Sequence, residues 1–190
     1  LIAAAKKEGQ VTWYTTQIVN QFVAPTAQYF EKKYGIKVNY VRAETSQVLL
    51  RVINEAKAGK LQADIVDGTG MAALVKEGLV EKWLPESVKR LPKEYYDPDG
   101  FWTATNLYVR VAGYNTNLVK RGEEPRSYED LLDPKWKGKM AISYSMSTTA
   151  NVIGAMVLTL GEDYVRKLGA QDNRVYPLLG RALANLTISG

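Results

Sequence analysis

The first part of the chain repeats one pattern three times: a short apolar run is followed by a loop and then by apolar residues at helical spacing. The apolar runs are rich in β-branched and aromatic residues and have the length of strands. The later apolar residues recur every three or four positions, as on one face of an α-helix. The predicted strands are residues 11–15, 36–41 and 63–66, and the predicted helices bury Val23, Ala27, Phe30 and Tyr34, then Val48, Leu49, Val52, Ile53 and Ala56, then Met71, Leu74 and Val75.

Three strand–helix units in succession favour a wound α/β sheet of parallel strands, because parallel neighbours need a crossover and a helix supplies it. The Ala-rich opening, residues 1–8, predicts a helix ended by Gly9. This opening lacks the order of a signal peptide, so we expect that any targeting segment has already been removed.

The second half of the chain is less regular. Prolines and polar residues between Trp83 and Gly100 favour a surface connection. Strand patterns return at residues 101–105, 107–114 and 139–143, and the apolar run 152–160 predicts a helix. We expect a second lobe that begins near Tyr114.

Composition excludes several kinds of chemistry. The 190 residues include no Cys and no His, which removes thiolate nucleophiles, imidazole bases and the usual zinc ligands. No apolar run approaches the roughly 18 residues of a membrane helix. The net charge is +5, but the 25 Lys and Arg are scattered among 20 Asp and Glu, so we expect small anions rather than nucleic acid as partners.

Small hydroxyl-bearing residues follow each predicted strand. In open parallel sheets ligands bind beyond the carboxyl ends of the strands, and the first turn of the next helix favours an anion. The alternative is that these residues only cap helices and form turns. The candidate ligand contacts in these loops are Thr16, Gln17, Thr45, Ser46, Thr69, Ser145, Ser147, Thr148 and Thr149.

Arg110 is a further candidate contact, because it interrupts the apolar run 107–114. A cation there must reach solvent or pair with a negative group, which is either a bound anion or a structural salt bridge. Asp64 and Asp67 flank the third predicted strand without a base nearby, so we expect them to accept hydrogen bonds from backbone amides rather than to act as a catalytic pair.

The order of motifs resembles the extracellular solute-binding proteins of bacterial ABC importers, in the group of the ferric-iron binders, with the type II periplasmic binding fold. The motifs that carry the resemblance are VTWYT at 11–15, FEKKYGIKV at 30–38, ADIV at 63–66, YNT at 114–116 and LDPKWKGK at 132–139. The resemblance implies two lobes joined by crossing strands that close over a ligand. It then implies lobe 1 at residues 1–105, a crossing strand at 106–113 and lobe 2 at 114–190, with the C-terminal part of the fold missing.

The metal chemistry of the iron binders does not carry over to this sequence. Where they place a His after the first strand the chain has Ile18, and where they place a Glu after the third it has Thr69. Of two arginines on their crossing strand, only the one that aligns with Arg110 persists, while Tyr108 replaces the other. Ferric iron prefers anionic oxygen donors, so the changes weaken the iron interpretation, although the run 145–149 matches the family's anion loop.

The sequence therefore favours a periplasmic, monomeric solute-binding protein that holds a small anionic organic solute between its lobes and delivers it to an ABC transporter permease. We expect no catalysis, no cofactor and no metal. One alternative is ferric iron held with a synergistic anion, and another, on the same fold, is a transferase or the sensing domain of a regulator.

Overall fold

The computed structural model describes residues 1–144, 146–178 and 180–190, without the side chains of residues 146–148. The described chain divides into two compact units, Leu1–Leu107 and Tyr108–Gly190. Each unit combines parallel strands with helices, as the sequence predicted.

The first unit is built around strand β1 (Gln10–Thr15). It pairs in parallel with β2 (Lys37–Arg42) from Gln10↔Lys37 to Thr15↔Arg42, and with β3 (Ile65–Val66) at Trp13↔Ile65. The resulting strand order, β2-β1-β3, requires crossover helices. All these strands therefore end at one edge of the sheet.

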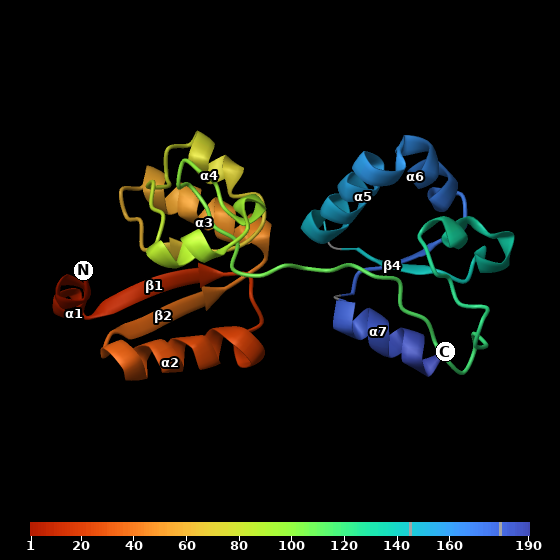
Figure 1. The fold of residues 1–190 in the computed structure, drawn as a ribbon, viewed down its shortest axis with the longest axis horizontal. Helices are drawn as coiled ribbons and strands as arrows, with labels where there is room; N and C mark the ends of the chain where they lie inside the picture. Colours follow the sequence, from red (N-terminus) through yellow and green to blue (C-terminus); the bar gives the residue numbers. More distant parts are fainter. Residues whose placement is uncertain (145, 179) are drawn as a thin grey trace. The chain divides into compact units, whose positions relative to one another are not determined.

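Helices cover both faces of this sheet (Figure 1). Helix α2 (Ala24–Tyr34), preceded by the π-helical turn Val19–Val23, lies on one face, and α3 (Thr45–Lys57) and α4 (Ala72–Lys76) lie on the other. Tyr14, Val48, Val52 and Leu74 form the buried cluster on the α3 side. The predicted helical faces thus become the packed faces.

The ends of the first helices follow local sequence signals. The opening helix α1 (Ile2–Glu8) ends at Gly9 and α2 ends at Gly35, and both glycines have left-handed backbones, with φ of 80° and 68°. A residue without a Cβ takes this conformation without a steric penalty.

The connection after α4 differs from the prediction. Short 3₁₀ turns occupy Glu86–Arg90 and Lys93–Tyr95, and the expected strand 101–105 is reduced to one antiparallel bridge, Tyr96↔Thr103. The expected crossing strand 106–113 lies in no described strand. Its residues have the composition of a strand, but a strand also needs a hydrogen-bonded neighbour, and no described segment supplies one.

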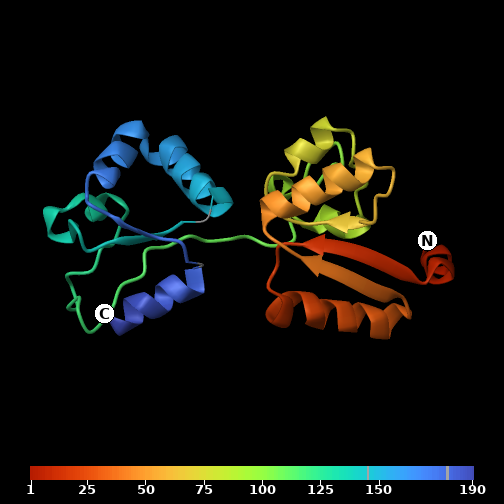
Figure 2. The ribbon, with the colours of Figure 1, turned by 180° about the vertical axis from the view of Figure 1, so that it is seen from behind.

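The second unit contains a smaller parallel sheet. Strand β4 (Ala141–Ser143) pairs with β5 (Arg174–Tyr176), and α5 (Met146–Leu160) and α6 (Glu162–Gly169) lie on the side opposite α7 (Gly180–Ser189), as Figure 2 also shows. Before β4 the chain forms 3₁₀ turns at Glu129–Leu132 and Pro134–Trp136. Among the described residues, no helix is both long enough and apolar enough to span a membrane.

Candidate functional site

The loops that follow β1, β2 and β3 meet at one edge of the first unit. The amide of Ala43 after β2 donates to the Thr15 carbonyl at 3.1 Å, and the amide of Asp67 after β3 donates to the Tyr14 carbonyl at 2.9 Å. Parallel pairing places both loops beside the end of β1. We call this group of loops, residues 16–18, 43–46 and 67–70, the strand-end loops.

Asp67 joins two of these loops. Its Oδ2 accepts from Trp13 Nε1 at 2.6 Å and from the Thr15 hydroxyl at 2.7 Å, while its Oδ1 accepts from the Thr16 amide at 3.1 Å. Asp64 likewise accepts from the Thr12 amide at 2.7 Å. Both aspartates bind backbone amides, as predicted, but the sequence did not show that Asp67 also organises side chains of β1.

Thr16 and Gln17 lie directly after β1. The half-buried Thr16 places its hydroxyl 3.4 Å from Asp67 Oδ1. Gln17 is only 8% exposed, and its Nε2 donates to Asn106 Oδ1 at 2.7 Å. Asn106 was not among the predicted residues, because no local signal links positions 89 apart in the sequence.

If the loop residues only capped helices, the alternative weighed above, Thr45 or Ser46 would be the N-cap of α3, but the structure differs. Its N-cap is Glu44, whose side chain accepts from the Gln47 amide, while the Gln47 side chain accepts from the Glu44 amide at 3.3 Å. This reciprocal capping box leaves Thr45 and Ser46 in the first turn, half-buried and exposed respectively. Both remain at the strand-end loops.

Thr69 is exposed in the loop after β3. Beside it, Gly68 brings that loop close to the first one: a Cβ at Gly68 would lie 3.0 Å from Thr16 Cγ2. The absence of a side chain at Gly68 therefore permits the two loops to touch. The structure thus brings Thr16, Gln17, Thr45, Ser46 and Thr69 together on the loops of one sheet edge.

The candidates of the second unit are only partly described. Ser145 lies outside the described residues, as do the side chains of Ser147 and Thr148. The Thr149 hydroxyl donates to the Ser143 carbonyl at 2.8 Å and so ties the start of α5 to the end of β4. It stays a prediction that candidate residues of both units contact the same ligand.

Arg110 lies in no described strand, although the sequence predicted one there. Its exposed guanidinium lies 5.6 Å from the centre of the Tyr108 ring, and its backbone carbonyl accepts from the Tyr128 hydroxyl at 2.7 Å. The sequence analysis gave a structural salt bridge as the alternative to a bound anion at Arg110. Among the described contacts of Arg110 there is no salt bridge.

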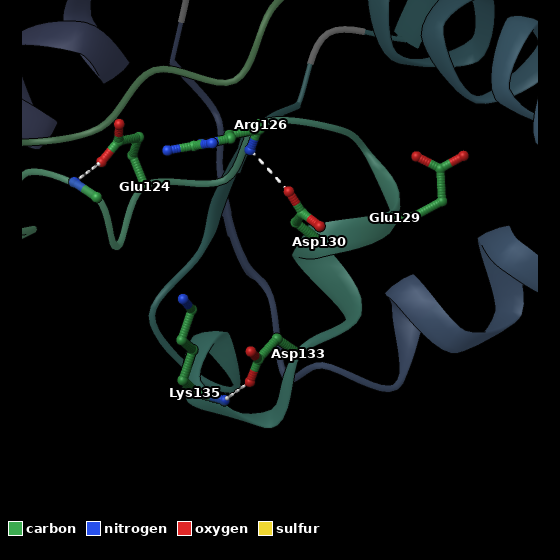
Figure 3. Close-up of a pocket in the computed structure, with 7 residues that line it drawn as sticks. Glu124, Arg126, Glu129, Asp130, Asp133 and Lys135 are labelled. Carbon is green, nitrogen blue, oxygen red and sulfur yellow. Dashed lines mark hydrogen bonds between the residues drawn. The ribbon is translucent and has the colours of Figure 1, made fainter.

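A hollow of about 510 Å³ in the second unit contains none of the predicted contacts (Figure 3). Its carboxylates serve turns: Asp130 accepts from the Arg126 amide at 2.8 Å and Asp133 from the Lys135 amide at 2.9 Å. The backbone amides of Arg126 and Ser127 lower the pKa of Asp130. Four acidic and two basic side chains line this hollow, so it does not suit an anion. The lining residues are Gly122, Glu124, Arg126, Glu129, Asp130, Asp133 and Lys135.

No group of three or more acidic residues in the described parts of the chain is placed to hold a metal ion. At the strand-end loops Asp67 and Glu44 already accept protein hydrogen bonds, which leaves hydroxyls and amides as the other polar groups there. Neutral donors of this kind recognise anions and polar organic groups.

Residues 63–174 match a protein family described as bacterial extracellular solute-binding protein. Iron uptake protein A1 of Synechocystis is 32% identical over 139 residues, which are 70% of this chain and 38% of that protein. A probable ABC transporter periplasmic-binding protein of Sinorhizobium fredii, y4fP, is 30% identical over 134 residues, which are 67% of this chain and 36% of that protein.

Solved structures show the same fold. Iron-bound HitA from Pseudomonas aeruginosa has a TM-score of 0.73 at 20% identity, with 94% of this chain and 60% of that chain covered. The periplasmic binding protein AfuA from Actinobacillus pleuropneumoniae, with fructose-6-phosphate bound, has a TM-score of 0.65 at 23% identity, with 88% and 58% covered. These matches confirm the type II periplasmic binding fold.

The chain spans less than two thirds of the length of each of these proteins. Within that span, the family match covers more than half of the chain and agrees with the resemblance seen in its motifs. The chain therefore belongs to the family of bacterial extracellular solute-binding proteins, and it is periplasmic.

Proposed function

We propose that the protein binds a small anionic organic solute and delivers it to the permease of an ABC importer, as a monomer and without catalysis. The observation that carries this proposal is the chemistry of the strand-end loops. Both carboxylates there, Asp67 and Glu44, are occupied by protein donors, and α3 begins at the same edge. A helix N-terminus with hydroxyls beside it stabilises negative charge.

In this proposal the solute contacts Thr16, Gln17, Thr45, Ser46 and Thr69 in the first unit. Arg110, Ser145, Ser147, Thr148 and Thr149 supply the contacts of the second unit. The exposed guanidinium of Arg110 gives a charged, bidentate donor, which suits a carboxylate or phosphate group. The bound sugar phosphate of AfuA shows that this fold accommodates such a solute.

Ferric iron with a synergistic anion is the second candidate. It is favoured by the Synechocystis relative, which is named an iron uptake protein. Two observations argue against iron. Ile18 and Thr69 offer no anionic oxygen, and the carboxylates of the strand-end loops already accept hydrogen bonds from protein donors. Iron requires such oxygen donors.

The test is a titration of the purified chain, followed by its tryptophan fluorescence, to which Trp13, hydrogen-bonded to Asp67 at these loops, contributes. The panel contains dicarboxylates, tricarboxylates, sugar phosphates, ferric citrate and ferric iron with carbonate. Saturable binding of an iron-free organic anion supports the proposal. Binding of ferric forms alone, with a charge-transfer colour, would replace it with the iron function.

Two charge variants separate the candidates further. Ser46→Asp places a carboxylate in the first turn of α3, where the helix tolerates it, and we expect about tenfold weaker binding of an organic anion through repulsion. Ser46→Asn is the uncharged control. Arg110→Ala should weaken anion binding by about 1.5–3 kcal/mol, whereas Arg90→Ala, which removes the same charge at the end of an exposed turn, should leave it unchanged.

A further inference from the structure

We propose that the first unit docks on an anionic lipid surface through the edge of its sheet where the strands begin. This edge, which we call the strand-start edge, consists of residues 1–9, 31–37 and 57–64. Because the strands are parallel, it lies opposite the strand-end loops. Docking there leaves those loops free, whichever solute they hold.

Hydrogen bonds within the first unit hold the three segments of this edge together. The Lys37 amide donates to the Gly9 carbonyl at 2.9 Å, which joins the start of β2 to the end of α1. The Asp64 amide donates to the Thr12 carbonyl at 3.0 Å, which joins the residues before β3 to β1. Figures 1 and 2 show α1 and the C-terminal ends of α2 and α3 on the side where β1 begins. Lysines that are scattered in the sequence therefore gather on one edge.

The strand-start edge is strongly basic. It has seven lysines against three acidic residues, a net charge of +4, whereas the whole first unit has 14 basic against 12 acidic residues. Two of the acids, Glu31 and Asp64, accept hydrogen bonds from the amides of Val38 and Thr12 at 2.8 and 2.7 Å. Every one of these lysines is exposed, and the ion pairs of the described residues include none of them. The lysines are Lys6, Lys7, Lys32, Lys33, Lys37, Lys57 and Lys60.

Exposed apolar side chains belong to the same edge. Helix α1 buries none of its residues, and Ile2 within it is 54% exposed. Leu61, which directly follows Lys60, is 46% exposed. A soluble polyanion matches the charge alone, whereas a lipid surface attracts lysines to its headgroups and also takes up apolar side chains just below them. The combination of lysines with apolar side chains therefore favours lipid.

The expected binding is reversible and depends on salt. Each lysine near an anionic membrane strengthens binding about fivefold, and the attraction fades within about 10 Å at 0.1 M salt. A lysine in the last turn of a helix also stabilises that helix through the helix dipole. That role needs no partner, so a direct measurement of lipid binding separates the two roles.

The experiment measures co-sedimentation of the purified chain with lipid vesicles. One set of vesicles contains two parts phosphatidylcholine to one part phosphatidylglycerol, and the other set contains phosphatidylcholine alone. We expect binding to the anionic vesicles at about 0.1 M salt, weaker binding as salt is added, and none to the neutral vesicles. If the chain does not bind the anionic vesicles even at about 0.01 M salt, where screening is weak, the proposal is wrong.

Paired lysine substitutions locate the docking surface. Lys32→Gln combined with Lys33→Gln should weaken binding to the anionic vesicles about tenfold or more, since two ammonium groups leave the edge. Lys93→Gln combined with Lys120→Gln removes the same charge from exposed positions outside the edge and should bind nearly as the parent chain does. Equal weakening by the two pairs would show attraction by net charge alone, and the strand-start edge would then not be the docking surface.

Apolar substitutions separate a lipid surface from a soluble polyanion. Ile2→Ser should weaken vesicle binding about threefold or more through lost apolar burial, whereas Leu158→Ser, at an 88% exposed position of α5, should not. Circular dichroism verifies that each variant is folded. If Ile2→Ser and Leu61→Ser both bind as the parent chain does, charge is the only contact, and a soluble polyanion replaces lipid as the partner.

Discussion

Glu55 on α3 receives three hydrogen bonds beside the buried Tyr14. The Tyr14 hydroxyl donates to Oε1 at 2.8 Å, Arg51 Nε donates to the same oxygen at 2.7 Å, and the Gln62 amide donates to Oε2 at 3.1 Å. Burial by itself would raise the pKa of Glu55, but these hydrogen bonds outweigh it and the pKa lies below its ordinary value. Glu55 therefore stabilises the fold in its ionised form.

We predict that Glu55→Gln lowers the free energy of unfolding at pH 7 by about 1–3 kcal/mol, the usual range for hydrogen bonds to a charged group. A lowered pKa in the folded state contributes stability above the unfolded pKa, and this contribution disappears as the pH falls through the folded pKa. The parent chain should begin to lose this increment as the pH falls below about 4.5, the unshifted value, and the variant should lack this dependence.

Urea unfolding at pH 7 and at pH 3.5 measures both effects. Glu94→Gln, at an exposed carboxylate of a 3₁₀ turn, is the control and should match the parent chain. A Glu55→Gln variant with the same dependence of stability on pH as the parent chain would contradict the assignment.

Single residues were predictable where the signal was local. The aspartates around β3 were expected to bind backbone amides, because they directly flank a strand, and they do so. Asn106 was not predictable, because its partner Gln17 comes from a distant strand end and exists only in the folded unit.

At the scale of elements, the N-cap of helix α3 lies one residue before the first hydroxyl residue that the sequence offers as a cap. The sequence offers Glu44, Thr45 and Ser46 in succession, and hydroxyl residues are the commoner caps. The structure uses Glu44, since Gln47 lies three residues later and completes the reciprocal pair. The start of α3 is therefore fixed by a pair of side chains rather than by one hydroxyl.

We predict that Glu44→Ala lowers the free energy of unfolding by about 0.5–2 kcal/mol, as the loss of a helix cap does. Ser46→Ala should change it by less than about 0.5 kcal/mol, as an exposed surface position does. Thermal melting of both variants distinguishes the two possible caps. A larger loss with Ser46→Ala than with Glu44→Ala would return the capping role to Ser46.

Strands were harder to predict than helices in this chain. The helices α2 and α3 follow from spacing within one segment and α5 from one apolar run, but residues 101–105 and 107–114 also have strand composition and form at most one bridge. A helix satisfies its own backbone hydrogen bonds, whereas a strand depends on a neighbour from elsewhere in the sequence.

At the scale of the whole molecule, the buried core is unevenly divided. Of the ten described hydrophobic side chains that are buried, eight belong to the first unit, and only Tyr164 and Leu168 belong to the second. The second unit also has the shorter strand pairing, Ala141↔Arg174 to Ser143↔Tyr176. Apolar burial is the main stabilising contribution in folding, so the second unit should open more easily.

We predict that backbone amides of β1 and β2 exchange with deuterium at least about tenfold more slowly than those of β4 and β5, because local opening costs less where fewer apolar contacts must break. Hydrogen exchange followed by mass spectrometry measures this on the intact chain. Equal protection of the two sheets would show that the units open together as one cooperative structure.

The sequence alone determined the α/β class, the helical faces, the glycines that end the first helices and membership of the family, because these depend on spacing, on backbone freedom and on ordered motifs within short segments. The tertiary structure decided which loops meet at the end of β1, that Asp67 and Glu44 are already occupied, and that Gln17 holds Asn106. Those features arise between segments distant in the sequence, and hydrogen bonds of this kind form only when parallel pairing brings strand ends together.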